Sequence, residues 1–367
     1  MAHIVIDGRP INSSGYGRYL RGLVQNLARL DSQNSYTILT WPDFDSRAMN
    51  LPVNFKCVAS DYPISGSFRE QLGLLRQINK LKPDLVHFGV AQQPVLYRGK
   101  KITTIHDLTT VRFKSATRNI LVSNLKQFVY GWVIKKVARS SMAIIAPSKF
   151  VKKDLARFAG INPAKVGVVY EAADRITARV EPVPRVGDKP FIMYVGRAMP
   201  HKNLKRLVGA FEMLKKNSPD LMLVLAGKLD ANYKLVEALV SDKRLAHSVV
   251  FPGHVSEGQL RWLYENTAAY VFPSLSEGFG LPGLEAMAHG APVVSSKATC
   301  LPEIYGDAAV YFDPLSTNDI ARKINSVINS QSLRTQMIKR GRSQAARYSW
   351  KTMAKQTLEI YKQALGI

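Results

Sequence analysis

The chain has 367 residues, of which 46% are hydrophobic, and it carries 51 Lys and Arg against 27 Asp and Glu. This length and composition favour a globular protein of two domains and exclude a disordered or fibrous one. The sequence contains no run of eighteen apolar residues and no predicted signal peptide, so we expect a cytoplasmic protein without a membrane span.

The positive charge is concentrated in the first half of the chain. Residues 1–180 contain 27 Lys and Arg but only 11 Asp and Glu, and the densest stretch, residues 98–157, opposes 14 basic residues with Asp107 and Asp154. A field of this sign attracts nucleic acid, acidic lipid or phosphorylated substrates. A solvated basic surface without a specific partner is the alternative.

Short apolar runs alternate with amphipathic stretches in both halves of the chain. In the first half, strands are predicted at His3–Asp7, Tyr36–Thr40, Asp84–His87, Ile102–His106, Met142–Pro147 and Val166–Tyr170, and helices at Gly17–Leu30 and Phe68–Leu81. In the second half, strands are predicted at Phe191–Val195, Leu221–Ala226, Val249–Phe251, Ala269–Pro273, Pro292–Ser295 and Val310–Phe312, and helices at Leu204–Lys216, Ala231–Ser241, Ser256–Asn266 and Gly283–His289.

Several of these strands, such as Phe191–Val195, are almost continuously apolar, which indicates burial on both faces of a parallel sheet. The pattern therefore predicts an α/β protein with two Rossmann-like, doubly wound domains. The boundary should fall in residues 175–189, where a polar, proline-bearing stretch interrupts the alternation. We expect domains at residues 1–180 and 188–349. Ligands of such sheets bind beyond the carboxyl ends of the strands.

The most informative segment is residues 273–294, which follows a predicted strand. Glu277, Gly278, Phe279 and Gly280 form a loop, and Leu281 follows. A helix is expected to open with Pro282 near its first position, with Glu285 in its first turn. Glycines let backbone N–H groups approach a ligand, and a helix start carries partial positive charge. This combination predicts a diphosphate cradle flanked by two carboxylates.

Three further groups follow predicted strands. Gly196, Arg197 and Lys202 precede a helix that should start near Asn203, and this pair of cations suits a diphosphate. Gly15, Tyr16 and Gly17 belong to a glycine-rich loop that lacks the full dinucleotide spacing. His106 should close its strand and face either a sugar hydroxyl or a structural partner. The other histidines and the two cysteines, Cys57 and Cys300, have no metal-ligand spacing, so no metal site is predicted.

Taken together, these strings resemble the retaining glycosyltransferases of the GT-B fold, family four. The resemblance rests on the E-x7-E pair Glu277 and Glu285 within SEGFGLPGLEAMAHGAPVV, on VGR with Lys202, and on LPE followed by GDA at residues 301–308. The terminal YSWKTMAKQTLEIY is similar to the family's last helix, which implies that residues 350–367 complete the N-terminal domain. HDLTTVRF and GFGLP look closest to the bacterial mannosyltransferase branch.

The resemblance also implies a role for each motif residue. Glu277 and His106 would contact the transferred sugar, Glu285 would hold the ribose, and Arg197 and Lys202 would neutralise the diphosphate. The remaining donor-binding residues would be Gly15, Gly17, Gly196, Gly253, His254, Val255, Gly278, Phe279, Gly280 and Leu281. The nucleobase would lie near Gly253–Ser256.

The implied activity is transfer of a hexose from a nucleotide-sugar donor to a glycan or lipid-linked acceptor during surface polysaccharide or glycolipid synthesis. Mannose from GDP-mannose is the first expectation, and a UDP- or ADP-sugar is the alternative. No cofactor and no metal are expected, because two cations and a helix start oppose the leaving group. A nucleotide-sugar epimerase and a nucleic-acid-binding protein are remote alternatives. The basic stretch lacks the spaced aromatic residues of a nucleic-acid binder.

The segment at residues 119–142 predicts a helix at a membrane surface. Leu121, Leu125, Phe128, Val129, Trp132, Val133 and Val137 should gather on one side, with Lys126, Lys135, Lys136 and Arg139 offset from them. Large apolar groups beside lysines are typical of a helix in the interface of an anionic membrane. We therefore expect a peripheral protein on the inner face of the cell membrane. Packing of this stripe on the sheet is the alternative.

Overall fold

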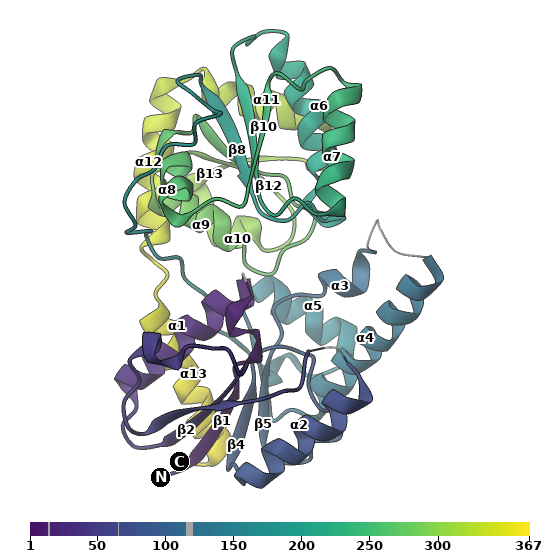
Figure 1. Ribbon diagram of the computed structural model, residues 1–367, viewed down its shortest axis with the longest axis vertical. Helices are drawn as coiled ribbons and strands as arrows, with labels where there is room; N and C mark the ends of the chain where they lie inside the picture. The colour runs from purple at the N-terminus through teal and green to yellow at the C-terminus, as the bar shows by residue number, and fades with distance from the viewer. Residues whose placement is uncertain (14, 65, 115–119) are drawn as a thin grey trace. The chain divides into compact units, whose positions relative to one another are not determined.

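The structure is a computed structural model that describes residues 1–13, 15–64, 66–114 and 120–367. The chain forms two compact units, each with its own sheet (Figure 1). The first unit contains Met1–Val111, Lys126–Glu171 and Ser349–Ile367. The second contains Ala172–Tyr348 and the described part of Arg112–Leu125.

The sheet of the first unit has seven parallel strands in the order β3-β2-β1-β4-β5-β6-β7. The strands are β1 His3–Asp7, β2 Ser35–Thr40, β3 Phe55–Ala59, β4 Leu85–Phe88, β5 Lys101–Thr104, β6 Ala143–Ala146 and β7 Val166–Val168. β3 was not predicted, because this edge strand mixes exposed and buried side chains and lacks a continuous apolar run. β5 ends at Thr104, so His106 follows the strand instead of closing it.

The sheet of the second unit has six parallel strands in the order β10-β9-β8-β11-β12-β13. The strands are β8 Phe191–Val195, β9 Met222–Ala226, β10 Val249–Gly253, β11 Ala269–Phe272, β12 Val293–Ser296 and β13 Ala309–Phe312. β8 and β9 are almost wholly buried, as their apolar sequences predicted. In both sheets the strand order reverses beside the first strand, which is β1 in one unit and β8 in the other.

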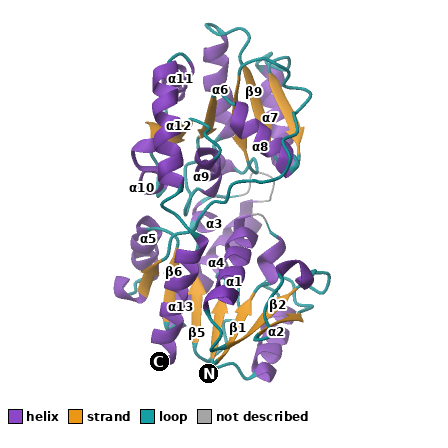
Figure 2. Cartoon of the chain, turned by 90° about the vertical axis from the view of Figure 1, so that its left-hand side faces the viewer, coloured by secondary structure: helices purple, strands orange, loops and turns teal. Residues whose placement is uncertain are grey.

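Helices flank the strands in each unit (Figure 2). The α-helices before β8 are α1 Gly15–Leu30, α2 Phe68–Leu81, α3 Thr109–Arg112, α4 Ile120–Ser140 and α5 Lys149–Ala159. Those after it are α6 Leu204–Lys215, α7 Ala231–Asp242, α8 Glu257–Asn266, α9 Leu281–Ala288, α10 Leu301–Tyr305, α11 Thr317–Ile328, α12 Gln331–Ala345 and α13 Trp350–Leu365. The fold class predicted from the sequence, two doubly wound α/β domains, is therefore correct.

The last helix, α13, packs in the first unit although its sequence follows the whole of the second. Its yellow ribbon lies beside the purple ribbon of α1 in Figure 1. The contact is close, because a Cβ atom at Gly22 of α1 would meet the Trp350 ring at 2.6 Å. Ser349 caps the helix by accepting a hydrogen bond from the Thr352 N–H, which satisfies one of the first-turn donors.

Helix α4 has an exposed apolar side, but not with all the residues that were predicted for it. Phe128 is 75% exposed and Trp132 is 52% exposed, whereas Val137 is fully buried. Val137 was therefore assigned to the wrong side, because the side of α4 that carries Ile134 and Ala138 faces the core. Residue 119 and the side chain of Leu121 lie outside the described part of the chain. Among the described residues, no helix is long and apolar enough to cross a membrane.

Candidate active site

The glycine-rich loop between β11 and α9 can take its shape only because glycine occupies two positions. Gly280 has φ +94°, a left-handed conformation, and a Cβ atom there would meet the Tyr305 Oη at 2.5 Å. A Cβ atom at Gly283 would meet the same oxygen at 2.2 Å. The Tyr305 hydroxyl donates a hydrogen bond of 2.6 Å to the Gly280 carbonyl. Tyr305, which the sequence analysis did not single out, thus anchors the predicted cradle.

The start of α9 lies two residues earlier than predicted. The helix begins at Leu281, directly after Gly280, with Pro282 in its first turn as expected. Glu285 is consequently the fifth residue of the helix, and its placement in the first turn was wrong. Gly278 and Phe279 are buried in the loop before the helix, and Phe279 packs edge-on against the Tyr348 ring at 5.5 Å.

Glu277 and Lys202 were assigned to different groups of the donor, and the structure pairs them. The Lys202 ammonium donates to a carboxylate oxygen of Glu277 at 2.6 Å, and both side chains are largely buried. The Glu277 backbone is held by Thr299, whose hydroxyl accepts from its N–H at 3.1 Å, and by the Cys300 thiol, which lies 3.3 Å from its carbonyl oxygen. Neither Thr299 nor Cys300 was predicted to belong to the site.

Glu285 is buried deeper than Glu277. Only 4% of the residue is exposed, and the Tyr264 hydroxyl lies 3.4 Å from one of its carboxylate oxygens. The two glutamates therefore differ in their surroundings. Glu277 is paired with a cation, whereas Glu285 neighbours a phenol.

Arg197 follows β8 and is open to solvent. Its side chain is 65% exposed, and one guanidinium nitrogen lies 3.5 Å from the Asp230 carboxylate. Asp230 also caps α7 by accepting hydrogen bonds from the N–H groups of Asn232 and Tyr233. Burial alone would raise the pKa of Asp230, but these N–H groups and the charge of Arg197 bring it below its usual range.

Three glycines meet at the carboxyl ends of neighbouring strands in the second unit. Gly196 follows β8, Gly227 follows β9 and Gly253 ends β10, and all three have positive φ. A Cβ atom at Gly227 would lie 2.1 Å from the Gly196 carbonyl oxygen, and the Gly227 N–H donates to the Gly253 carbonyl at 2.9 Å. Gly227 was not predicted, although it ends an apolar strand in the same way as Gly196. His254 is exposed and Val255 is half-buried beyond Gly253.

The remaining candidates, Gly15, Gly17 and His106, lie together in the first unit. Gly15 opens α1, and a Cβ atom at Gly17 would meet the Ile11 carbonyl oxygen at 2.4 Å. The Tyr16 ring lies between these glycines in sequence and contacts the His106 ring, with centroids 4.8 Å apart.

Both ring nitrogens of His106 face protein oxygen atoms. Nδ1 is 2.9 Å from the Glu171 carboxylate and Nε2 is 3.0 Å from the Gly89 carbonyl. Burial alone lowers the pKa of His106, but the hydrogen bond and charge of Glu171 outweigh it and raise that pKa above its usual value. The protonated ring can donate to both oxygen atoms, and contact with a sugar requires one of these two hydrogen bonds to be shared.

Comparisons with known proteins define the class of the chain. Residues 13–175 match the family described as Glycosyltransferase Family 4, and residues 177–344 match Glycosyl transferases group 1. The matches cover almost the whole chain, including every candidate catalytic and donor-binding residue described above. The chain therefore belongs to these glycosyltransferases.

A curated relative and two solved structures are similar to the chain. The O-antigen chain mannosyltransferase B of Escherichia coli is 34% identical over 173 residues, which is 47% of this chain and 45% of that protein. The match thus spans less than half the length of this relative. Sucrose-phosphate synthase from Thermosynechococcus elongatus has a TM-score of 0.78 at 20% identity, and the match covers 100% of both chains. Anabaena HepE in complex with UDP-glucose has a TM-score of 0.77 at 15% identity, with 99% and 100% covered. The two structures confirm the predicted GT-B fold, which consists of two Rossmann-like domains.

Proposed function

We infer that the chain is a retaining glycosyltransferase that moves a hexose from a nucleotide-sugar donor to a glycan or lipid-linked acceptor. The observation that carries the inference lies at the carboxyl end of the second sheet. There an exposed arginine, Arg197, and the Lys202–Glu277 ion pair accompany a glycine turn that leads into a helix start. Family membership and this arrangement of charge point to the same reaction.

The chemistry follows from the charge that develops as the donor breaks. Cleavage of the anomeric C–O bond leaves positive charge on the sugar and negative charge on the nucleoside diphosphate. Cations and helix N–H groups stabilise the departing anion when they are already in position. The Lys202 ammonium lies 2.6 Å from the Glu277 carboxylate. The site therefore holds a cation for the negative charge on the departing diphosphate and a carboxylate for the positive charge on the sugar. Retention of the anomeric configuration is part of the proposal.

Mannose from GDP-mannose is the proposed donor, because the Escherichia coli relative bears the name of an O-antigen chain mannosyltransferase. A UDP-sugar is the second candidate, since HepE, which shares the fold, was solved with UDP-glucose. Gly253–Ser256, where the nucleobase is proposed to lie, belongs to the second unit in either case.

A thermal-shift panel of GDP, UDP and ADP, each alone and as its hexose conjugate, tests the proposal. A ligand that binds only the native state raises Tm according to its occupancy. GDP and GDP-mannose should give the largest shifts, and GDP-mannose with a mannose-containing glycan should yield an α-linked product by NMR. A preference for UDP would mean that the donor is a UDP-sugar, and the proposed transfer reaction would still stand. No shift with any nucleotide, or interconversion of the donor sugar without acceptor, would refute the proposal.

The leaving group is proposed to need no metal ion. Lys202 and Arg197 supply the positive charge that a divalent cation would otherwise bring to the diphosphate. Transfer should therefore persist in excess EDTA. Loss of activity in EDTA that returns with Mg²⁺ or Mn²⁺ would contradict this part of the proposal.

The first unit is further proposed to dock on an anionic membrane, which would place the protein on the inner face of the cell membrane, where a lipid-linked acceptor is accessible. On α4 the exposed Phe128 and Trp132 are accompanied by lysines and an arginine. A hollow of about 370 Å³ is lined by Trp132, Lys135, Lys136, Arg139 and Ser140. Aromatic groups next to cations are typical of the membrane interface, where each basic residue contributes about 1 kcal/mol to binding of anionic lipid.

Co-sedimentation with liposomes tests the docking. Binding should require acidic lipid, decrease as salt rises, and drop in the Lys135→Glu, Lys136→Glu double variant. The matched control is Lys351→Glu, Lys355→Glu, which makes the same charge change at exposed positions of α13 in the first unit. Equal binding to neutral and acidic liposomes, or equal losses in the two double variants, would remove the support for α4 as the docking surface.

A further inference from the structure

The first unit contains a hollow that none of the candidate donor-binding residues lines, although Tyr16 in its wall lies between two of them, Gly15 and Gly17. Its volume is about 400 Å³, within the usual range for a small-molecule site. The lining includes Arg9, Asn12, Ser13, Tyr16, Trp41 and Gln92. Arg9 to Ser13 follow β1, Trp41 follows β2 and Gln92 follows β4, so the hollow lies at the carboxyl ends of neighbouring strands. This is where doubly wound sheets bind ligands.

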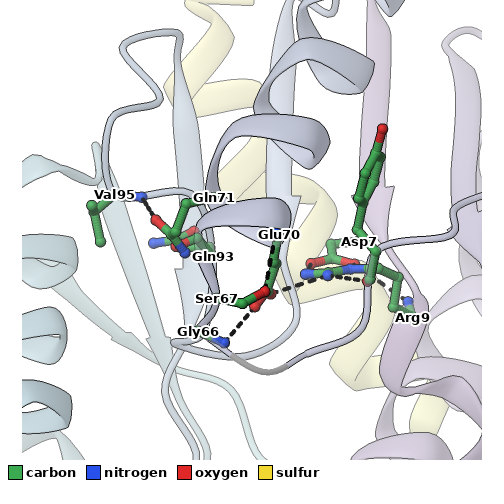
Figure 3. A network of polar contacts seen from close by, with 9 residues as sticks. Asp7, Arg9, Gly66, Ser67, Glu70, Gln71, Gln93 and Val95 are labelled. Carbon is green, nitrogen blue, oxygen red and sulfur yellow. Dashed lines mark hydrogen bonds and ion pairs between the residues drawn. The ribbon is translucent and has the colours of Figure 1, made fainter.

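Arg9 is the one charged residue among the described residues that line the hollow, and its charge is already opposed. Its guanidinium donates to both carboxylate oxygens of Asp7 at 2.8 Å and to Glu70 at 3.1 Å (Figure 3). It also donates to the Tyr62 carbonyl at 2.7 Å. The side chains of Arg9, Asp7 and Glu70 are all fully buried. Two carboxylates therefore surround one guanidinium, which leaves no positive charge to attract an anion.

The same network fixes one wall of the hollow. Glu70 lies in the first turn of α2, accepts from Arg9 and also accepts from the Gly66 N–H at 2.6 Å (Figure 3). These contacts tie α2 and the segment before it to the end of β1. A fully hydrogen-bonded buried charge network is a rigid support, because breaking it leaves a charge unpaired.

The exposed lining combines aromatic faces with uncharged hydrogen-bonding groups. Trp41 is half-buried, and Tyr16 is 40% exposed. Asn12, Ser13 and Gln92 provide amide and hydroxyl groups. Arg21 reaches the Asn12 side chain at 3.4 Å but is exposed and does not line the hollow. A pyranose ring matches this surface, since its C–H face packs on an aromatic ring and its hydroxyls meet the polar groups.

We propose that this hollow binds the acceptor, and that the part of the acceptor seated here is an uncharged sugar unit of a glycan and not a phosphorylated or acidic one. The proposal rests on the proposed glycosyltransferase function. It assigns different chemistry to the two units. The anionic groups of the donor bind in the second unit, and a neutral sugar of the acceptor binds in the hollow that Arg9 lines.

Saturation-transfer NMR with simple sugars tests the proposal. The probes are the methyl α-glycosides of mannose, glucose, galactose and N-acetylglucosamine, together with mannose 6-phosphate and glucose 6-phosphate. At least one neutral glycoside should bind, and its phosphorylated counterpart should bind about tenfold more weakly or not at all. Tighter binding of a sugar phosphate, or no binding of any neutral glycoside, would overturn the proposal.

Substitutions at two positions locate the binding. Trp41→Leu should weaken the neutral glycoside about tenfold, because the ring face is lost, whereas Trp41→Phe should retain most of the binding. Gln92→Lys should weaken the neutral glycoside and strengthen the sugar phosphate. The matched control, Gln33→Lys, makes the same charge change at an exposed position of the same unit and should change neither affinity.

Nucleotide binding separates this proposal from the one on which it rests. Wild type and all four variants should show the same Tm rise with the nucleotide that binds best in the donor panel. If the nucleotide shift is normal but Trp41→Leu and Gln92→Lys bind the sugars like wild type, the acceptor assignment is wrong and the donor site stands. If no nucleotide binds wild type, the glycosyltransferase proposal itself fails.

Discussion

The two units place the same dipeptide at the same point of their sheets and use it differently. Gly8-Arg9 follows β1, and Gly196-Arg197 follows β8, each beside the position where the strand order reverses. The Arg9 side chain is fully buried between two carboxylates, whereas the Arg197 side chain is 65% exposed and lies 3.5 Å from one. One arginine is part of the framework, and the other is available to a ligand.

The neighbouring residues cause this difference. β1 ends in Asp7, whose carboxylate binds Arg9, while β8 ends in the apolar Val195. Glu70 of α2 supplies the second buried carboxylate in the first unit. A cation at a strand end is therefore not sufficient evidence for a phosphate site. The two arginines differ in whether buried carboxylates on two sides already oppose the guanidinium.

Loss of Arg9 should give the largest effect, and it should be on folding. Arg9→Met would leave Asp7 and Glu70 buried without their partner, and breaking such a pair costs about 3–5 kcal/mol. Urea denaturation monitored by circular dichroism measures the loss. Arg197→Met should change the free energy of unfolding by less than about 0.5 kcal/mol, because its side chain is exposed. Equal losses in the two variants would show that the contrast in burial has no energetic consequence.

Loss of Arg197 should instead affect donor binding. Arg197→Ala is expected to weaken nucleoside-diphosphate binding by about 1.5–3 kcal/mol, the range for a hydrogen bond to a charged group. Isothermal titration calorimetry measures it. Arg322→Ala is the control, since Arg322 is also an exposed arginine paired with an aspartate in the same unit. An unchanged dissociation constant in Arg197→Ala would show that this cation does not meet the diphosphate.

The two glutamates of the second unit allow a finer division of the site. Glu285→Gln should weaken the nucleoside diphosphate and the whole donor alike, by about 1 kcal/mol, because a ribose contact is present in both. Glu277→Gln should leave nucleoside-diphosphate binding nearly intact and depress transfer. Calorimetry and a transfer assay on each variant provide the comparison. Identical profiles for the two variants would refute the division between ribose and sugar.

The sequence was sufficient for every described strand except β3 and for the motif loop, because these depend on local pattern. Continuous apolar runs predicted β8 and β9, and the glycines of residues 278–283 predicted a tight turn before a helix. The ion pair between Lys202 and Glu277 could not be predicted, since 75 residues separate the partners in the chain. Tyr305 and Thr299 support the loop from positions 25 and 22 residues further along the chain. Arg9 shows the same limit, because its second carboxylate comes from α2, 61 residues later.

The smallest expected effect concerns His106, whose two ring nitrogens face protein oxygen atoms in the first unit. Unlike Arg9 it can lose its proton, so its contribution depends on pH. Because Glu171 raises the pKa of His106, the charged pair should stabilise the fold fully below about pH 6.5, the unperturbed histidine value, and less as pH rises through the folded-state pKa. Glu171→Gln should therefore cost more stability at pH 6 than at pH 8.5.

Histidine NMR titration measures the cause directly. The pKa of His106 should lie above 6.5 in wild type and fall in Glu171→Gln, since the hydrogen bond and the charge that raise it are weakened. His87 provides an internal reference in the same unit, because complete burial lowers its pKa to about 3 and it should stay neutral from pH 5 to 9 in both proteins. A wild-type pKa at or below 6.5 would mean that burial outweighs Glu171. His106 would then be a neutral imidazole next to Tyr16, and Arg9 would be the one buried cation among the candidates described in that unit.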